Sequence, residues 1–399
     1  MRECQRLNRR VFFLVASLLL LASFRAFASW DEYTLRGYVK DLVGLHRTDP
    51  HLVEPGLRLS NTIHARQNLR WYPTYTLTGA LEVKTWLAAL LIENEAMDGI
   101  EPVAEGVPEF GQARYFDWSW TPIDQEDVTL MTTIDRAWVD WYAGQIQVTA
   151  GRQRIAWGTN LAWNPIDLFN PYSPLDFDNE ERPGTDGLRF QYYTGPSSKV
   201  EVAAAPVEEF EKSVTAALVK INRWRYDLHF LGGRRGRGTV VGTAWAGQIR
   251  GGGFRGEALY TYPDEDSHIP EPYLVAGVSG DYTFPNSFYL LGEVLFNQRG
   301  TTGPAGGLHW ATAIAEGELT PARTSLFGQV ALNITPLIRG SISGILNPHD
   351  RSWYIGPSID QSLATDLDFT AIALIFGGDE RTEFGDLGQM LFLRLKMSF

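Results

Sequence analysis

The chain ends in a stretch that alternates between apolar and polar side chains as far as its last residue. Within residues 389–399, Arg394, Lys396 and Ser398 separate the apolar residues. A repeat of two places side chains on opposite faces of a β-strand, so the segment is predicted to be a strand with one apolar and one polar face. Either an edge strand of a water-soluble sheet or a strand in contact with lipid fits this pattern. The apolar positions are Leu391, Leu393, Leu395, Met397 and Phe399.

The first residues have the features of a secretory signal peptide. A basic start precedes an apolar run of about 14 residues, which is shorter than the ~20 residues of a membrane-spanning helix. Ala26-Phe27-Ala28 then supplies the small residues of a cleavage site, so we expect residues 1–28 to be removed. The single cysteine, Cys4, lies in this leader. The mature chain, residues 29–399, is therefore predicted to have no disulfide and no thiol chemistry.

Composition excludes several classes of protein. The net charge of −12 becomes more negative once the arginine-rich leader is removed, which argues against a nucleic-acid partner. Mean hydropathy is slightly negative and no second long apolar stretch follows, so a helical membrane protein is excluded. A transmembrane β-barrel remains compatible, because only alternate strand residues face lipid. The 39 glycines and the abundant aromatic residues suit such a barrel, although a secreted β-sandwich could share them.

Alternation recurs along most of the chain. It is clear in residues 62–71, in residues 223–230 and in residues 288–297, where Leu290, Val294 and Phe296 oppose Glu293 and Asn297. In a soluble sandwich the apolar face would form the core and the polar face would meet water. In a membrane barrel this arrangement is inverted, because apolar side chains face lipid and polar ones line the lumen.

The lengths of the connections favour the barrel. Short connections alternate with long ones, so all tight turns fall at one end, as in barrels with short periplasmic turns and long external loops. A Greek-key sandwich does not generally keep this parity. We therefore predict one all-β domain, a closed antiparallel transmembrane β-barrel of about 18 strands, with 16 as the alternative. The predicted strands are 33–46, 60–72, 74–92, 132–142, 145–157, 186–194, 198–205, 213–220, 223–231, 239–249, 254–262, 272–283, 287–297, 322–333, 336–346, 353–360, 366–376 and 388–399.

Two segments resemble known families. The last strand is similar to the closing strand of Gram-negative outer-membrane barrels, which implies that Phe399 is the aromatic signal read by the barrel-assembly machinery. Residues 151–167 resemble the uncharacterised DUF1302-type group of proteobacterial porin-like barrels, and more distantly the alginate-export barrels. The resemblance covers about 40 residues and implies an outer-membrane barrel without indicating its cargo. The positions that carry it are Gly151, Arg152, Gln153, Trp157, Gly158, Pro165 and Asp167.

The same region provides the candidate site. Arg152 and Arg154 are predicted to share one strand face, with Arg136 on the preceding strand and Asp135, Asp140 and Asp167 available as partners. The following connection, residues 158–185, is long and acidic, and we expect it to fold inward and narrow the pore. The arginines can brace this loop or contact the solute, and the sequence leaves both roles open. Arg66, Arg70, Arg223 and Arg225 are further candidates for the lumen wall.

These features predict an outer-membrane porin-like channel for small polar or anionic solutes, or an exporter. No catalytic, metal-binding or cofactor-binding motif is present, so neither an enzyme nor a cofactor is expected. The expected partners are outer-membrane lipid, lipopolysaccharide near the basic residues 232–238, and the assembly machinery. The oligomeric state cannot be predicted. The alternatives are a non-conducting scaffold or surface-anchoring barrel, or a barrel enzyme.

Overall fold

The computed structural model describes residues 34–47, 57–71, 76–90, 115–125, 128–170, 184–208, 212–265, 267, 271–306, 313 and 317–399. All elements with assigned bounds in these ranges are β-strands. Within the same ranges no helix has the length and apolar character needed to cross a membrane. The predicted leader lies outside the described residues.

The described residues form 19 strands. They are β1 (Thr34–Arg47), β2 (Leu57–Trp71), β3 (Thr76–Leu90), β4 (Ser119–Gln125), β5 (Val128–Ala143), β6 (Ile146–Gln153), β7 (Thr185–Tyr193), β8 (Lys199–Ala205), β9 (Val214–Arg223), β10 (Tyr226–Arg235), β11 (Gly238–Ile249), β12 (Gly252–Pro263), β13 (Tyr273–Thr283), β14 (Tyr289–Asn297), β15 (Thr324–Thr335), β16 (Ile338–Leu346), β17 (Trp353–Ala364), β18 (Leu367–Gly377) and β19 (Gln389–Ser398).

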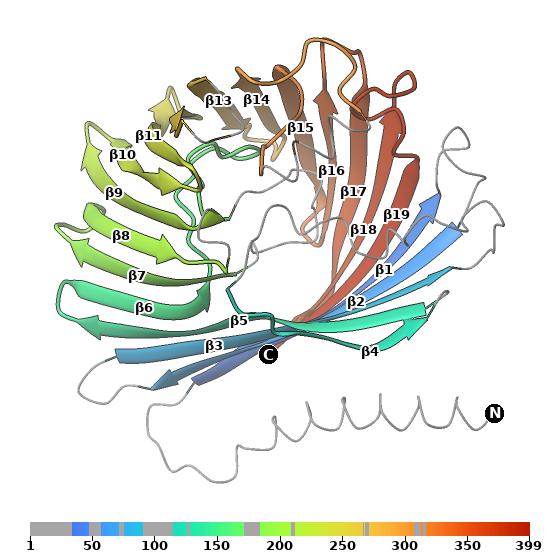
Figure 1. Ribbon diagram of the computed structural model, residues 1–399. Coiled ribbons are helices and arrows are strands. Elements are labelled where there is room, and N and C mark those ends of the chain that lie inside the picture. The colour runs from blue at the N-terminus through green and yellow to red at the C-terminus, as the bar shows by residue number, and fades with distance from the viewer. Residues whose placement is uncertain are drawn as a thin grey trace, which may run out of the picture.

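All these strands belong to one antiparallel sheet that curves round an interior (Figure 1). Neighbours in the sequence pair with each other, except that β3 pairs with β5, and the short β4 lies along the part of β5 that β6 does not reach. β1 pairs with both β2 and β19, so the first strand lies beside the last. The backbone of the terminal residue takes part in this pairing, because Phe399 and Gly37 exchange two hydrogen bonds of 2.9 Å.

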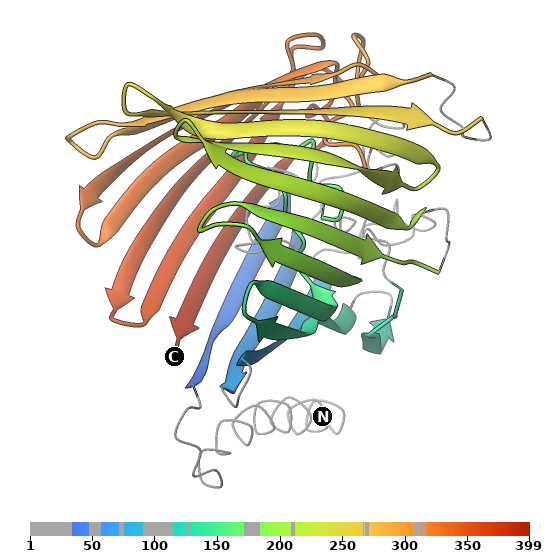
Figure 2. The same ribbon diagram turned by 90° about the vertical axis from the view of Figure 1, so that its left-hand side faces the viewer.

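Tight turns gather at the end of the sheet where the chain terminates (Figure 2). At this end two residues separate β5 from β6, β9 from β10, β11 from β12 and β15 from β16. Connections at the opposite end are mostly longer, as between β6 and β7 and between β14 and β15. The β10–β11 connection is an exception, because only Gly236 and Arg237 join these strands.

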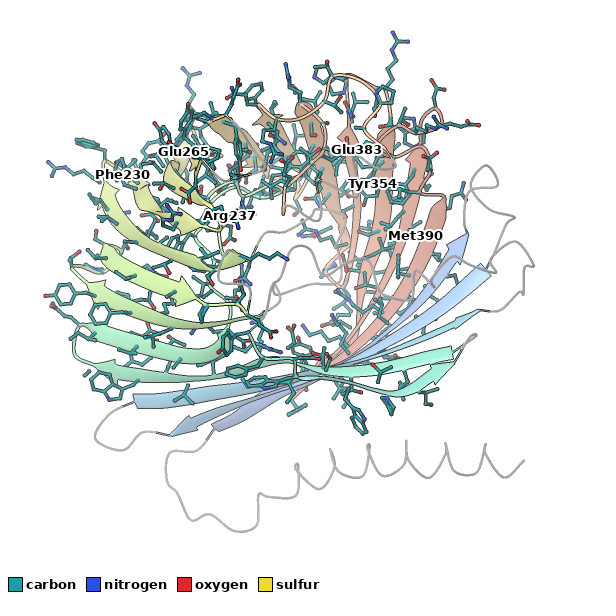
Figure 3. The ribbon with its side chains drawn as sticks, in the orientation of Figure 1. Phe230, Arg237, Glu265, Tyr354, Glu383 and Met390 are labelled. Carbon is teal, nitrogen blue, oxygen red and sulfur yellow. The ribbon has the colours of Figure 1, made fainter. Side chains whose placement is uncertain are left out.

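The two faces of the sheet differ in the way expected of a membrane barrel. On β14, Leu290, Val294 and Phe296 are exposed on the outer face, whereas Glu293 and Asn297 are buried inside. Phe230 of β10 likewise projects outward (Figure 3). Large exposed apolar side chains recur on the outer face from β7 to β19, while the buried polar residues lie on the concave side. A soluble sandwich would bury those apolar rows.

Each predicted strand overlaps one observed strand, with two corrections. β4 falls between the predicted strands 74–92 and 132–142, where no strand was predicted, so the count of 18 differs from the 19 described strands. The strand predicted from residue 223 to 231 is wrong at its start, because Trp224 and Arg225 form a two-residue turn between β9 and β10. Both have positive φ, 55° and 67°, as a type I′ hairpin turn requires. The sequence hides this turn because it has none of the usual Asn or Gly residues.

The β9–β10 turn generates a stability prediction. Arg225→Gly should raise the free energy of unfolding by up to about 1 kcal/mol, since glycine adopts positive φ without the cost an L-residue incurs. Arg223→Gly is the matched control, because Arg223 lies in β9 and glycine lowers the stability of a strand by roughly 0.5–1 kcal/mol. Guanidinium unfolding of both variants in detergent micelles measures the difference. Destabilisation by Arg225→Gly would contradict the turn geometry.

Candidate functional site

Residues 154–170 leave the end of β6 and run inside the curve of the sheet, where they form no regular secondary structure (Figure 1). We call these residues the inward segment. All of residues 162–170 are buried, whereas Arg154 and Leu161 are exposed. The first part of the predicted loop 158–185 therefore lies within the molecule. Residues 171–183, which carry its predicted acidic cluster, lie outside the described residues.

Two glycines of the motif are required by close contacts. Gly151 has φ of 111°, and a Cβ atom there would lie 2.3 Å from the carbonyl oxygen of Ala137 on β5. A Cβ atom on Gly158 would overlap the side chain of Asn164, which folds back across the inward segment. Only glycine therefore allows β6 to approach β5 and the inward segment to turn upon itself.

Arg152 fixes the point at which the inward segment begins. Its Nε and Nη2 atoms donate to the two carboxyl oxygens of Asp186 on β7, at 2.8 and 2.9 Å. The guanidinium also donates to the carbonyl oxygens of Ile134 and Phe116, and it lies 4.5 Å from the ring centroid of Trp118. Arg152 is fully buried. A two-pronged ion pair with these added hydrogen bonds holds three segments of chain together.

The middle of the inward segment is held by two buried glutamates of the sheet. Glu257 of β12 accepts hydrogen bonds from the backbone N–H groups of Thr159, Asn160 and Ile166 and from the Thr159 hydroxyl. Glu293 of β14 accepts from the next three backbone N–H groups, at 3.3, 2.9 and 2.8 Å. These carboxyl groups satisfy backbone donors that have no strand to pair with. The three donors on Glu293 belong to Leu161, Ala162 and Trp163.

A third glutamate holds the beginning of the segment. The indole Nε1 of Trp157 donates to Glu201 of β8 at 2.7 Å. Arg189 and Lys199 also engage Glu201, at 2.6 Å each, while His229 Nδ1 lies 3.2 Å from the carbonyl oxygen of Trp157. The two basic side chains remain partly accessible, at 17% and 19%. Basic groups and the inward segment thus share one acceptor on the inner wall.

Apolar packing connects the inward segment with two parts of the sheet. Trp157, Ile166 and Phe169 belong to a buried cluster with residues of β8 to β12. Ala162 and Trp163 belong to a second cluster with residues of β1 and of β14 to β19. Trp157 and Trp163 are each only 2% exposed, so both serve as packing residues. The two ends of the segment thus pack on β8 to β12 and its middle packs on the second cluster, so the segment lies against a broad stretch of the inner wall.

The structure distributes the predicted site residues differently from the sequence interpretation. Arg136 is buried with its Nε atom 3.8 Å from Asp135, and Asp140 accepts a hydrogen bond from Thr149. Asp167 lies next to Trp157: its carboxyl oxygen Oδ1 accepts a hydrogen bond from the backbone N–H of Trp157, with an N···O distance of 3.4 Å. The prediction that Arg154 shares the face of Arg152 is wrong, because β6 ends at Gln153 and the strand alternation ends with it. Pro165 is buried, and the Gln153 amide donates to the carbonyl oxygens of Thr149 and Gly187.

The remaining candidates lie away from this constellation. Arg66 and Arg70 are on β2, where only the backbone is described: they pair with Tyr38 and Thr34 of β1. Arg223 and Arg225 are exposed at the β9–β10 turn.

Sequence reasoning missed the residues that anchor the segment. Asp186 stands directly opposite Arg152 in the β6–β7 register, which is visible only once the two strands are paired across the long connection. Glu201, Glu257 and Glu293 each occupy the polar face of a predicted strand, so alternation does place them inside. It gives no indication that their partners are backbone N–H groups of a distant loop. Among the described residues no cluster of acidic, histidine or cysteine side chains is suited to a metal ion.

Comparisons with solved structures identify the fold. OprD of Pseudomonas aeruginosa, an outer membrane protein, matches 94% of this chain and 95% of its own at 10% identity, with a TM-score of 0.57. OccAB2 of Acinetobacter baumannii matches 93% of this chain and 98% of its own at 8% identity, with a TM-score of 0.55. No family model and no curated protein matches the sequence. At such identities the likeness shows that the chain has the fold of these β-barrels.

The buried ion pair provides the next prediction. Asp186→Ala leaves Arg152 charged, buried and without its carboxyl partner, so the free energy of unfolding should fall by about 3–5 kcal/mol. The double variant Arg152→Met/Asp186→Leu removes both charges and should recover most of this loss. Loss of the heat-resistant folded band in detergent gel electrophoresis measures both. Equal destabilisation by the single and double variants would contradict the pairing.

Proposed function

We propose that this protein is a channel of the Gram-negative outer membrane, built as a closed β-barrel of 18 membrane strands with β4 as an added strand at one rim. The pairing of β1 with both β2 and β19 supports closure. Closure leaves no sheet edge unpaired in lipid, where an unpaired backbone group costs several kcal/mol. The outward apolar rows and the fold shared with OprD support the location and a transport rather than an enzymatic role.

The observation that carries the proposal is the anchoring of the inward segment along the inner wall of the sheet. Glu257 and Glu293 hold consecutive backbone N–H groups, and Trp157 and Trp163 pack on different stretches of wall. Ordering a chain segment costs about 1–2 kcal/mol per residue, and these hydrogen bonds and buried indoles offset that cost. We propose that the segment is the constriction that selects among solutes.

Charges on the inner wall support a polar or anionic solute. Arg189, Lys199 and Lys220 lie on adjacent strands β7 to β9, with Glu201 and Asp227 as their partners. The three basic side chains remain 17%, 19% and 24% exposed, so their field reaches a solute in the lumen. A narrow bore strengthens such a field. Arg152 is fully buried, which favours the bracing role over direct solute contact.

The termini and surface complete the proposal. Residues 1–28 act as the cleaved signal peptide, and Phe399, whose side chain is 51% exposed, is the signal for the barrel-assembly machinery. Acyl chains contact the outer apolar rows, and lipopolysaccharide contacts the basic residues near the β10–β11 turn.

The alternative function is a non-conducting scaffold whose lumen is plugged. The burial of the inward segment is compatible with a plug as well as with a constriction. Planar-bilayer recordings of the refolded mature protein separate the two functions. Discrete single-channel steps support the channel. Silence under all conditions supports a scaffold whose lumen the segment fills.

Loss of the glutamate anchors should enlarge the channel. Glu257→Ala/Glu293→Ala frees the middle of the inward segment, so single-channel conductance should rise roughly twofold or more, with added noise as the segment moves. Asp360→Asn is the matched control, because this carboxyl engages Thr370 and Arg394 and does not contact the segment. Unchanged conductance in the double variant would contradict the constriction.

Contact with lipid can be tested separately. Val294→Arg places a charge at the middle of the outer face of β14 and should lower the free energy of unfolding in bilayers by about 2–4 kcal/mol. Leu337→Arg is the control, because Leu337 lies in the β15–β16 turn, where the cost should be about 0–1 kcal/mol. Equal losses in the free energy of unfolding at the two positions would show that the outer face of β14 does not contact lipid.

A further inference from the structure

Three connections meet at the end of the sheet opposite the tight turns. They are the described residues 298–306 and 317–323 between β14 and β15, residues 347–352 between β16 and β17, and residues 378–388 between β18 and β19, and we call them the outer connections. Gly306 of the first donates its N–H to the carbonyl oxygen of Arg381 in the third, at 2.8 Å. Figure 3 shows Glu383 at this end, above Tyr354.

Glu383 lies where the outer connections join. Its carboxyl group accepts hydrogen bonds from Thr320 Oγ1 at 2.9 Å and from Asn347 Nδ2 at 3.0 Å, so one side chain contacts the other two connections. Its backbone N–H donates to Asp350 at 2.8 Å, and the same oxygen of Asp350 accepts from Ala305 at 3.2 Å. Glu383 is only 6% exposed and Asp350 only 9%.

The charged groups around Glu383 do not neutralise it. Among the described residues, neither Glu383 nor Asp350 forms an ion pair with a basic side chain. In the first outer connection, Arg299 pairs with Glu318, and Arg323 donates to the carbonyl oxygen of Gly300. The second outer connection also contains the titratable or charged residues His349 and Arg351. The third contains Asp379, Glu380, Arg381 and Asp386, and the Asp386 carboxyl accepts hydrogen bonds from the backbone N–H of Arg381. Two buried carboxyl groups thus face each other without a cation.

Packing connects this junction with the inward segment. Phe384, next to Glu383, is buried and stacks on Phe376 of β18 with ring centroids 6.3 Å apart. It belongs to the same apolar cluster as Trp163, which meets Phe327 of β15 edge-to-face at 6.1 Å. A displacement of residues 378–388 therefore disturbs the packing around one end of the proposed constriction.

We propose that Glu383 is a proton-operated latch, which holds the outer connections together while it carries a proton and loosens them when it loses that proton. The inference rests on the proposed channel function for its effect on transport. The latch itself depends only on the contacts among the outer connections. Loosening should open the outer end of the lumen and mobilise the packing of Trp163.

The direction of the pH dependence follows from burial. Burial raises the pKa of Glu383 from 4.5 to about 7, and the negative charge of the neighbouring Asp350 adds to the rise. The hydrogen bonds from the Thr320 hydroxyl and the Asn347 amide oppose it. A raised pKa in the folded state means that the protonated form stabilises the fold. This stability is fully present below the unfolded pKa, near 4.5, and is lost as the pH rises through about 7. The latch should thus be tight in acid and loose in mild alkali.

Hydrogen exchange of the refolded mature protein tests the latch directly. At about pH 8.5, amides of residues 379–387 should exchange at least tenfold faster in the unaltered protein than in Glu383→Gln, which keeps the neutral form. At about pH 4.5, the ordinary pKa of the group, the two should agree within a factor of about two. Glu380→Gln, an exposed glutamate of the same connection, is the matched control and should follow the unaltered protein. A second variant, Asp350→Asn, should shift the transition of the unaltered Glu383 to lower pH.

Planar-bilayer recording across the same pH range supplies the functional readout. Closing events should become at least about tenfold rarer from pH 4.5 to 8.5 in the unaltered protein and in Glu380→Gln, and change less than twofold in Glu383→Gln. Equal exchange in all variants at pH 8.5, or an unshifted transition in Asp350→Asn, would overturn the latch even if the channel conducts. The predicted exchange difference without any conductance would uphold the latch and refute the channel.

Discussion

The arrangement of the interior depends on hydrogen bonds between buried carboxyl groups of the sheet and backbone N–H groups of the inward segment. Glu257 and Glu293 stand on the concave face of the sheet, where burial without a partner is costly. The inward segment has backbone N–H groups that no strand pairs. Each satisfies the other, through six hydrogen bonds from described backbone N–H groups and one from the Thr159 hydroxyl. At roughly 0.5–3 kcal/mol per bond, depending on charge, these contacts are large enough to decide whether the segment is ordered.

Much of the sheet could be predicted because its signal is local. A repeat of two identifies a strand without reference to its partners, which is why Leu290, Val294 and Phe296 were placed on one face and Glu293 on the other. The β9–β10 turn was missed because Trp224 and Arg225 adopt positive φ against their own preference, with the register of β9 and β10 holding them there. β4 was missed because it is short and lies within a long connection.

The candidate site was predicted only in outline. The sequence pointed to Arg152 and to an inward loop. In the structure Arg152 pairs with Asp186 at the point where the inward segment begins. Its partner was sought among Asp135, Asp140 and Asp167, whereas the structure supplies Asp186, which the β6–β7 register alone brings opposite. Carboxyl groups that bind backbone N–H groups leave no side-chain motif. Glu257 lies 91 residues or more along the chain from the amides it holds, so this contact has no local signature.

The central claim is that wall glutamates hold the backbone of the inward segment against the inner wall of the sheet. Hydrogen exchange of the amides of residues 159–163 tests it most directly. The account predicts that these amides exchange at least a hundredfold more slowly than solvent-exposed ones, because carboxyl acceptors bury them, and that Glu257→Ala/Glu293→Ala removes most of this protection. Rapid exchange in the unaltered protein, or protection that survives the loss of both glutamates, would contradict it.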